Sequence, residues 1–236
     1  MKPVLLIAVN FVREQRWPIL VLLLWVLLLA FQGLMTELPR EREDLLFIFK
    51  QVAVYVVVFS VFFGGSAIYN ERRSRRILAV LAKDVARHQY LSGLVIGVTM
   101  ACGLYCFTLG LTGSWTLGPS GFQIRDVWLL IVCLAAASAL AGTVALMFST
   151  FLNPFFAAGG TAVVLLLPAV LERTVNRNLG IIVPAWELTA TVVKSSFDSP
   201  VQISWTPILL ALIETVLFWL MSTWIFKRVD IAVAVE

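Results

Sequence analysis

The chain has 236 residues, of which 60% are hydrophobic and 14% are charged, and its mean hydropathy is +0.93. Soluble globular domains are about half apolar and about a quarter charged. The composition therefore excludes a soluble domain, a disordered tail and a collagen-like rod, and it indicates a polytopic membrane protein. Six helical spans of roughly 20 residues would use about half of the chain, which fits a single membrane domain.

Charge, cysteine and histidine usage narrow the classes further. The net charge of +4 comes from basic residues that lie between apolar segments, so their positions indicate membrane topology rather than binding to nucleic acid. Cys102, Cys106 and Cys133 lie within apolar segments and form no CxxC pair, so we interpret them as buried small side chains. His88 is the only histidine, which excludes a metal site made of several histidines from one chain.

The first 16 residues predict an interfacial helix lying on the membrane, because Leu5, Ala8, Val9 and Val12 fall on one helical face. A charged leader to the first span is the alternative. Six spans then follow, which must be helical because lipid offers no hydrogen bonds to an open strand. Their predicted limits are about 17–35, 45–69, 89–111, 127–151, 155–171 and 206–226.

Two segments between these spans are polar. Residues 71–88 are the most charged part of the chain, whereas residues 172–205 mix polar residues with short apolar runs. We expect the second segment to lie on the outer face, either as short helices or as an ordinary loop. Of the Lys and Arg residues, eleven fall on the side of the two termini and six on the other. The positive-inside rule therefore predicts that both termini and the 71–88 segment are cytoplasmic.

The 71–88 segment has the pattern of an amphipathic helix. Its apolar residues recur at helical spacing, among them Ile77, Leu78 and Leu81, and basic residues form the rest of its surface. Such a helix can lie among lipid headgroups as a basic anchor, or it can dock into the groove of a partner protein. A positive-inside loop without a partner is the third interpretation.

The same segment resembles the signature of ABC-2-type transporter permeases, the membrane subunits that separate ATPase subunits drive. In that family the second span runs into Glu-Arg-Glu-x-Gly-Thr-Leu-x-x-Leu-Leu-x-x-Pro, then a basic residue, then Gly-Lys at the third span. Here residues 71–87 read Glu-Arg-Arg-Ser-Arg-Arg-Ile-Leu-Ala-Val-Leu-Ala-Lys-Asp-Val-Ala-Arg, and Gly93 opens the third span. Arg75 and Arg76 stand in place of Gly-Thr, Asp84 in place of Pro, and Leu94 in place of Lys.

The resemblance extends over nearly the whole chain, because the interfacial helix, six spans and irregular outer segment also match. It implies a single all-α transmembrane domain over residues 1–236, with a cytoplasmic coupling helix at 71–88. In the family, short outer helices before the last span partly re-enter the membrane. The resemblance further implies a permease subunit of an ATP-driven exporter in the bacterial cytoplasmic membrane.

Partners follow from the same resemblance. A second permease, in a homodimer or heterodimer, would complete the pathway, to which spans two and five chiefly contribute. Partner ATPase subunits would bind ATP and Mg²⁺, because this chain has no GxxxxGK[ST] loop to hold phosphates. Contacts with the ATPase are implied for the coupling loop, at Glu71, Arg72, Arg73, Arg76, Ile77, Leu78, Leu81 and Arg87.

The spans offer apolar and aromatic surface with few charges, so an amphipathic or lipid-like substrate is expected. Tyr55, Phe59 and Phe62 of the second span are pathway candidates, although core packing or lipid contact would explain them as well. Glu214 lies inside the last span, where an ionised carboxylate is costly. It is either a substrate or cation contact or a structural carboxyl, protonated or hydrogen-bonded to Thr215 or a neighbouring helix.

Small residues in the third span predict close helix packing, since Gly93 and Gly97 lie one turn apart. Packing within the chain or a seam between two copies would both use such a ridge. A similar pattern recurs in the fourth span at Ser138 and Gly142.

Two other function classes remain open. One is a membrane scaffold or assembly subunit without transport, and the other is an integral membrane enzyme. An enzyme would need polar residues gathered at one membrane depth, whereas those of this chain are scattered. We therefore expect no catalytic residues, no bound cofactor and no metal in this chain.

Overall fold

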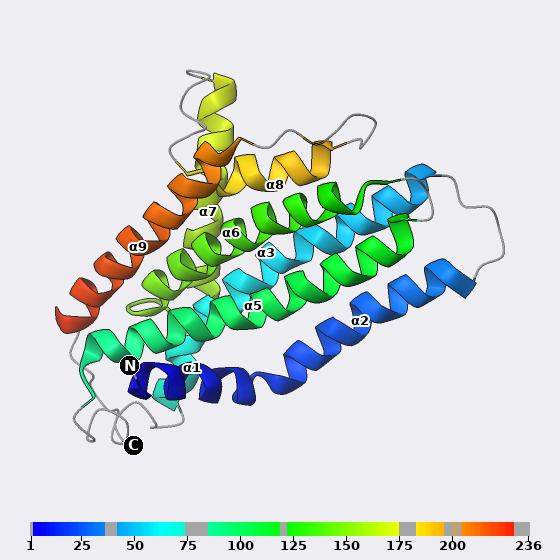
Figure 1. Cartoon of the computed structure of the whole chain (residues 1–236). Coiled ribbons are helices and arrows are strands. Elements are labelled where there is room, and N and C mark those ends of the chain that lie inside the picture. The colour runs from blue at the N-terminus through cyan, green and yellow to red at the C-terminus, as the bar shows by residue number, and fades with distance from the viewer. Residues whose placement is uncertain are drawn as a thin grey trace.

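The computed structural model describes residues 2–35, 42–73, 85–118, 122–174, 183–195, 201 and 204–228. This described part contains eight helices and no strand (Figure 1). The helices are α1 (Lys2–Glu14), α2 (Arg16–Met35), α3 (Arg42–Arg73), α5 (Arg87–Leu117), α6 (Ile124–Ser149), α7 (Pro154–Thr174), α8 (Ala185–Lys194) and α9 (Trp205–Arg228).

Four of these helices are long and apolar enough to cross a membrane, namely Asp44–Glu71 within α3, α5, α6 and α9. The chain thus has the architecture of an α-helical integral membrane protein. A fifth span results if α1 and α2 count as one span, but the two helices are bent by 64° at their junction. The first and fifth of the six predicted spans, over α2 and α7, are therefore not confirmed as crossings by the described residues.

The centre of the bundle is α6, which packs against α3, α5, α7, α8 and α9. Its second half is rich in alanine and contains Gly142, and small residues let helix backbones approach closely in a membrane. The closest crossing is with α3, where Gly64 faces the carbonyl oxygen of Gly142. One turn away, the Ser60 hydroxyl donates a hydrogen bond to the carbonyl oxygen of Ser138. Each helix therefore contributes a small residue, three intervening residues and a second small residue.

The N-terminal helix α1 lies along α5 (Figure 1). A Cβ atom added at Gly93 would lie 2.6 Å from Cβ of Ile7, and one at Gly97 would lie 2.9 Å from the Phe11 ring. Ala8 and Phe11 are buried in this contact, whereas Leu5 and Val9 are more than 45% exposed. The face of α1 that packs on α5 therefore includes Ala8 of the predicted apolar face, while Leu5 and Val9 of that face remain exposed. The glycines of α5 leave room for the side chains opposite them.

Large apolar side chains lie on the outer surface of the bundle as well as in its centre. On α2 and α9 most leucine, isoleucine and tryptophan side chains are about half exposed. Such a surface is unfavourable in water and is expected where lipid surrounds a helix. The start of α5, the end of α9 and the end of α3 lie at one end of the bundle (Figure 1), which we call the Arg87 end.

Candidate functional site

A large cavity lies between α3, α7 and α8 and has a volume of about 470 Å³. This volume falls in the range of small-molecule binding sites. Val58 and Phe62 line it and are also more than half exposed, so the cavity reaches the molecular surface. Its lining residues are Val54, Val57, Val58, Val61, Phe62, Ala158, Ala162, Leu165, Leu166, Ala185, Trp186 and Thr189.

The three helices line the cavity with different kinds of side chain. On α3 the lining is a stripe of valines over its middle third, and on α7 the small side chains of Ala158 and Ala162 leave the space open. Only 10 residues long, α8 is too short to span, and its first turn reaches the same cavity as mid-helix residues of α3. Val183 and Ala185 are buried there, at the junction after which α8 begins.

The lining is almost entirely apolar. It contains no charged side chain, and its one hydroxyl, that of Thr189, already donates to the carbonyl oxygen of Ala185 at 2.7 Å. Such a wall binds hydrocarbon by burial, and apart from the indole N–H of Trp186 it offers nothing to compensate an ion or a polar group for lost water. The cavity is therefore suited to the apolar part of an amphipathic molecule.

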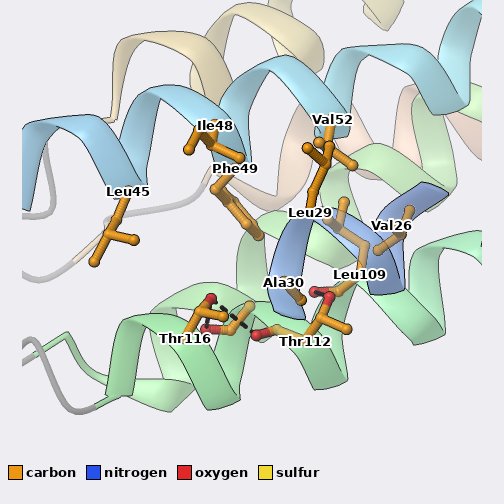
Figure 2. A pocket seen from close by; sticks show the side chains of 11 residues that line it. Val26, Leu29, Ala30, Leu45, Ile48, Phe49, Val52, Leu109, Thr112 and Thr116 are labelled. Carbon is orange, nitrogen blue, oxygen red and sulfur yellow. Dashed lines mark hydrogen bonds between the residues drawn. The ribbon is translucent and has the colours of Figure 1, made fainter. Parts of the chain in front are cut away.

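A second cavity lies between α2, α3 and α5, near the other end of the bundle (Figure 2). Its volume is only about 40 Å³, which is enough for one or two water molecules. Figure 2 shows Thr112 and Thr116 beside it, and both hydroxyls donate to carbonyl oxygens of their own helix at 2.9 Å. This second cavity is small, and the hydroxyls beside it are already hydrogen-bonded. It is therefore a weaker candidate binding site than the large cavity.

The aromatic pathway candidates separate in space. Phe62 lines the large cavity. Phe59 points toward α5, where its ring centre lies 6.4 Å from that of Tyr105, and it borders a small void of about 10 Å³. The Tyr55 ring lies 6.4 Å from that of Phe59 and is 38% exposed. Of the three, the structure brings only Phe62 to the cavity.

The valines of α3 are the residues that sequence reasoning missed. Val54, Val58 and Val61 recur at intervals of four and three residues, which places them on one helical face. That periodicity was available in the sequence, but a buried valine face and a lipid-facing one have the same spacing. The two cases differ in whether another helix lies opposite the valines, as α7 and α8 do here. That arrangement depends on contacts between segments that are distant in the sequence.

Glu214 lies on α9 and is not among the residues that line the large cavity. One of its carboxylate oxygens is buried without a hydrogen-bond partner among the described residues. The neighbouring hydroxyl of Thr215, which the sequence offered as a partner, donates instead to the carbonyl oxygen of Ala211 at 2.7 Å. The structure thus does not bring Glu214 to the cavity that Phe62 lines.

The coupling candidates are described only in part. The backbone of Arg72 and Arg73 belongs to α3, but their side chains lie outside the described residues, as do Arg76, Ile77, Leu78 and Leu81. The predicted coupling helix therefore lies almost wholly outside the described part of the chain.

The two ends of that segment are described. Glu71 is 7% exposed, and its side chain lies beside that of Tyr90 in the first turn of α5. Arg87 donates from Nη1 to the carbonyl oxygens of Phe226 at 3.0 Å and Lys227 at 3.1 Å. At these two ends, Arg87 thus contacts the end of α9 and Glu71 contacts the start of α5.

Among the described residues no group of three His, Cys, Asp or Glu side chains is arranged to hold a metal ion. The cysteines Cys102, Cys106 and Cys133 are buried and carry free thiols. The chain matches no protein-family model, and no curated protein matches it either.

Proposed function

We propose that the chain is the permease subunit of an ATP-driven exporter of the ABC-2 type, which moves an amphipathic or lipid-like substrate. The observation that carries the proposal is the apolar cavity of about 470 Å³ between α3 and α7. These helices correspond to the second and fifth predicted spans, the pair that the resemblance assigns to the pathway. The proposal also draws on the charged sequence that follows α3.

In this proposal the chain crosses the membrane six times. The first crossing is α2, with α1 as the interfacial helix before it, and the fifth is α7. A helix of 21 residues, such as α7, is about 31 Å long, which matches a hydrocarbon core of about 30 Å. In the same arrangement α8 is an outer helix that dips toward the cavity. Both termini face the cytoplasm, on the basis of the Lys and Arg distribution.

A second permease copy completes the pathway. The large cavity reaches the surface at Val58 and Phe62, so one chain alone leaves it open on that side. A two-fold axis beside α3 would set two such cavities against each other and would enclose an apolar passage. Exposed apolar side chains at the mouth of the cavity would then be covered by the second copy.

Energy comes from partner ATPase subunits in this scheme. The chain's loop between α3 and α5 docks on them, and ATP with Mg²⁺ binds to those partners. Because α3 also forms one wall of the cavity, a displacement of the loop would change the shape of the cavity wall. Nucleotide chemistry on one side of the membrane is thereby linked to substrate binding within it.

A copurification experiment tests the partner. The tagged chain, extracted in mild detergent, is expected to bring down an ATPase subunit. Replacing Leu78 and Leu81 together by Asp should abolish this association, whereas Val193→Asp, an exposed position on α8, should preserve it. If the wild-type chain binds no ATPase, the proposal is refuted.

A second experiment tests the cavity. Val58→Trp fills the cavity, and Leu104→Trp is the matched control because Leu104 is exposed on α5 and lines no cavity. In vesicles containing the chain and its ATPase, the first variant should abolish ATP-dependent movement of a fluorescent phospholipid between leaflets, and the second should not. An ATPase complex that moves neither this probe nor other amphipathic molecules would favour the scaffold function instead.

A further inference from the structure

A cluster of polar and aromatic contacts outside the large cavity surrounds Arg87, where the chain enters α5. Its guanidinium bonds to two of the last carbonyl oxygens of α9 and lies 5.9 Å from the centre of the Phe226 ring. The last carbonyls of a helix have no partner further along the chain, and the helix dipole favours a positive charge beside them. Arg87 therefore caps the C-terminus of α9 from another helix.

A second contact lies one turn further into α5. The rings of Tyr90 and Phe226 stack with their centres 6.3 Å apart and their planes 18° apart. Both side chains are almost completely buried, at 1% and 0% exposure. Because the Glu71 side chain also lies beside that of Tyr90, the ends of α3 and α9 both reach the first turn of α5. We call these four residues, Glu71, Arg87, Tyr90 and Phe226, the Arg87 junction.

We infer that the Arg87 junction makes α9 move together with the two ends of the loop between α3 and α5. The inference rests on the proposed function, in which a partner ATPase displaces that loop. Both α3 and α5 continue directly into the loop, whereas Phe226 is 139 residues away from Arg87 along the chain. The junction thus connects α9 to α3 and α5, two helices from which it is distant along the chain.

Arg87 is accordingly a positioning residue rather than an ATPase contact. Its Nη1 donor is used on the carbonyls of α9, and its guanidinium plane faces an aromatic ring. A packed helix shifts as a rigid body, so a connection at its last turn is enough to carry a displacement along α9. Glu214 lies three turns from this junction on the same helix, so its position in the membrane would follow the movement.

The experiment uses the full chain with its ATPase subunits in lipid nanodiscs, with the three native cysteines replaced by alanine. Spin labels at Leu220→Cys on α9 and Val132→Cys on α6 report the movement of α9, and both positions are exposed. A pair at Phe47→Cys on α3 and Val132→Cys reports the movement of α3. Trapping with ATP and vanadate should shift both distance distributions in the otherwise wild-type chain.

Arg87→Met removes the donors but keeps an unbranched side chain. It should abolish the shift of the α9 pair and preserve that of the α3 pair, and Arg87→Lys should restore part of the lost shift. Arg228→Met is the matched control, because Arg228 lies on the same turn of α9 but its guanidinium lies over the Trp224 ring, 3.8 Å from the ring centre. An unchanged α9 shift in Arg87→Met, or no α9 shift in the wild type while α3 moves, overturns the inference.

Hydrogen exchange on the isolated chain separates this inference from the proposed function. Without the cap, amides in the last turn of α9 should exchange about tenfold faster in Arg87→Met and at the wild-type rate in Arg228→Met. Unchanged exchange in Arg87→Met overturns the junction, whether or not an ATPase binds. Faster exchange in a chain that binds no ATPase refutes the proposed function and the transmitted movement, while the cap itself stands.

Discussion

The crossing of α3 and α6 gives the sharpest test of the fold. In Gly64→Ala, the new Cβ would collide with the carbonyl oxygen of Gly142 and would lie 3.0 Å from Cβ of Ala145. The first of these atoms belongs to the backbone of a buried helix, so relief requires α3 or α6 to move. Overpacking of this kind costs about 1–3 kcal/mol of unfolding free energy.

A matched variant removes the effect of helix propensity. Alanine is favoured over glycine inside a helix by up to about 1 kcal/mol, and this gain applies equally to Gly103→Ala on α5. No atom lies within 4 Å of a Cβ added at Gly103, so the difference between the two variants isolates the collision.

Thermal unfolding of the purified chain in one detergent measures this difference. At about 2–4 °C per kcal/mol for a chain of this size, Gly64→Ala should melt about 2–12 °C below Gly103→Ala. Equal melting temperatures of the two variants would refute the close approach of α3 and α6. The same result would remove the reason for the small residues at this crossing.

Three further outcomes are expected. Tyr105→Phe removes the hydroxyl that donates to the carbonyl oxygen of Val52 at 2.8 Å, so the unfolding free energy should fall by about 0.5–1.5 kcal/mol, and an unchanged melting curve would contradict this. Phe226→Ala empties a fully buried site and should cost about 3–5 kcal/mol in the same assay; a loss below 1 kcal/mol would argue against its burial. Ser195→Cys should react with a membrane-impermeant thiol reagent outside intact cells while Lys227→Cys stays unlabelled, and the reverse pattern would invert the predicted orientation.

Sequence alone was sufficient for the helices, because lipid imposes a simple rule on them. Each predicted span from the second to the fourth overlaps one long apolar helix, and the last does so as well. A membrane offers the backbone no hydrogen bonds, so a run of apolar residues is helical whatever surrounds it. The composition of a single segment is then enough to locate the helix.

Contacts between helices were less predictable, as Arg87 and α1 illustrate. The resemblance implies an ATPase contact for Arg87, which stays a prediction, but no local pattern indicated its bonds to carbonyls of a helix that begins more than 100 residues later. The buried face of α1 depends on Gly93 and Gly97 of another helix. Local periodicity indicates that a face is apolar, and it does not indicate what the face touches.

The large cavity shows why the candidate site follows different rules from those of a soluble protein. An empty void of about 470 Å³ in a water-soluble core would cost about 11 kcal/mol at roughly 24 cal/mol per Å³, so it would collapse or be filled by side chains. Between membrane helices this cost does not arise, because lipid tails are as apolar as the valines of α3 and can occupy the space.

A substrate would therefore displace lipid from the cavity, not water. Exchanging one hydrocarbon chain for another provides little free energy, so the apolar lining around Val58 and Phe62 can admit a substrate but discriminates weakly between tails. Selectivity among amphipathic molecules must then come from polar groups that meet the headgroup outside this lining. Lengthening the tail of a transported lipid should change its rate far less than changing its headgroup, and a strong dependence on tail length would contradict this account of the cavity.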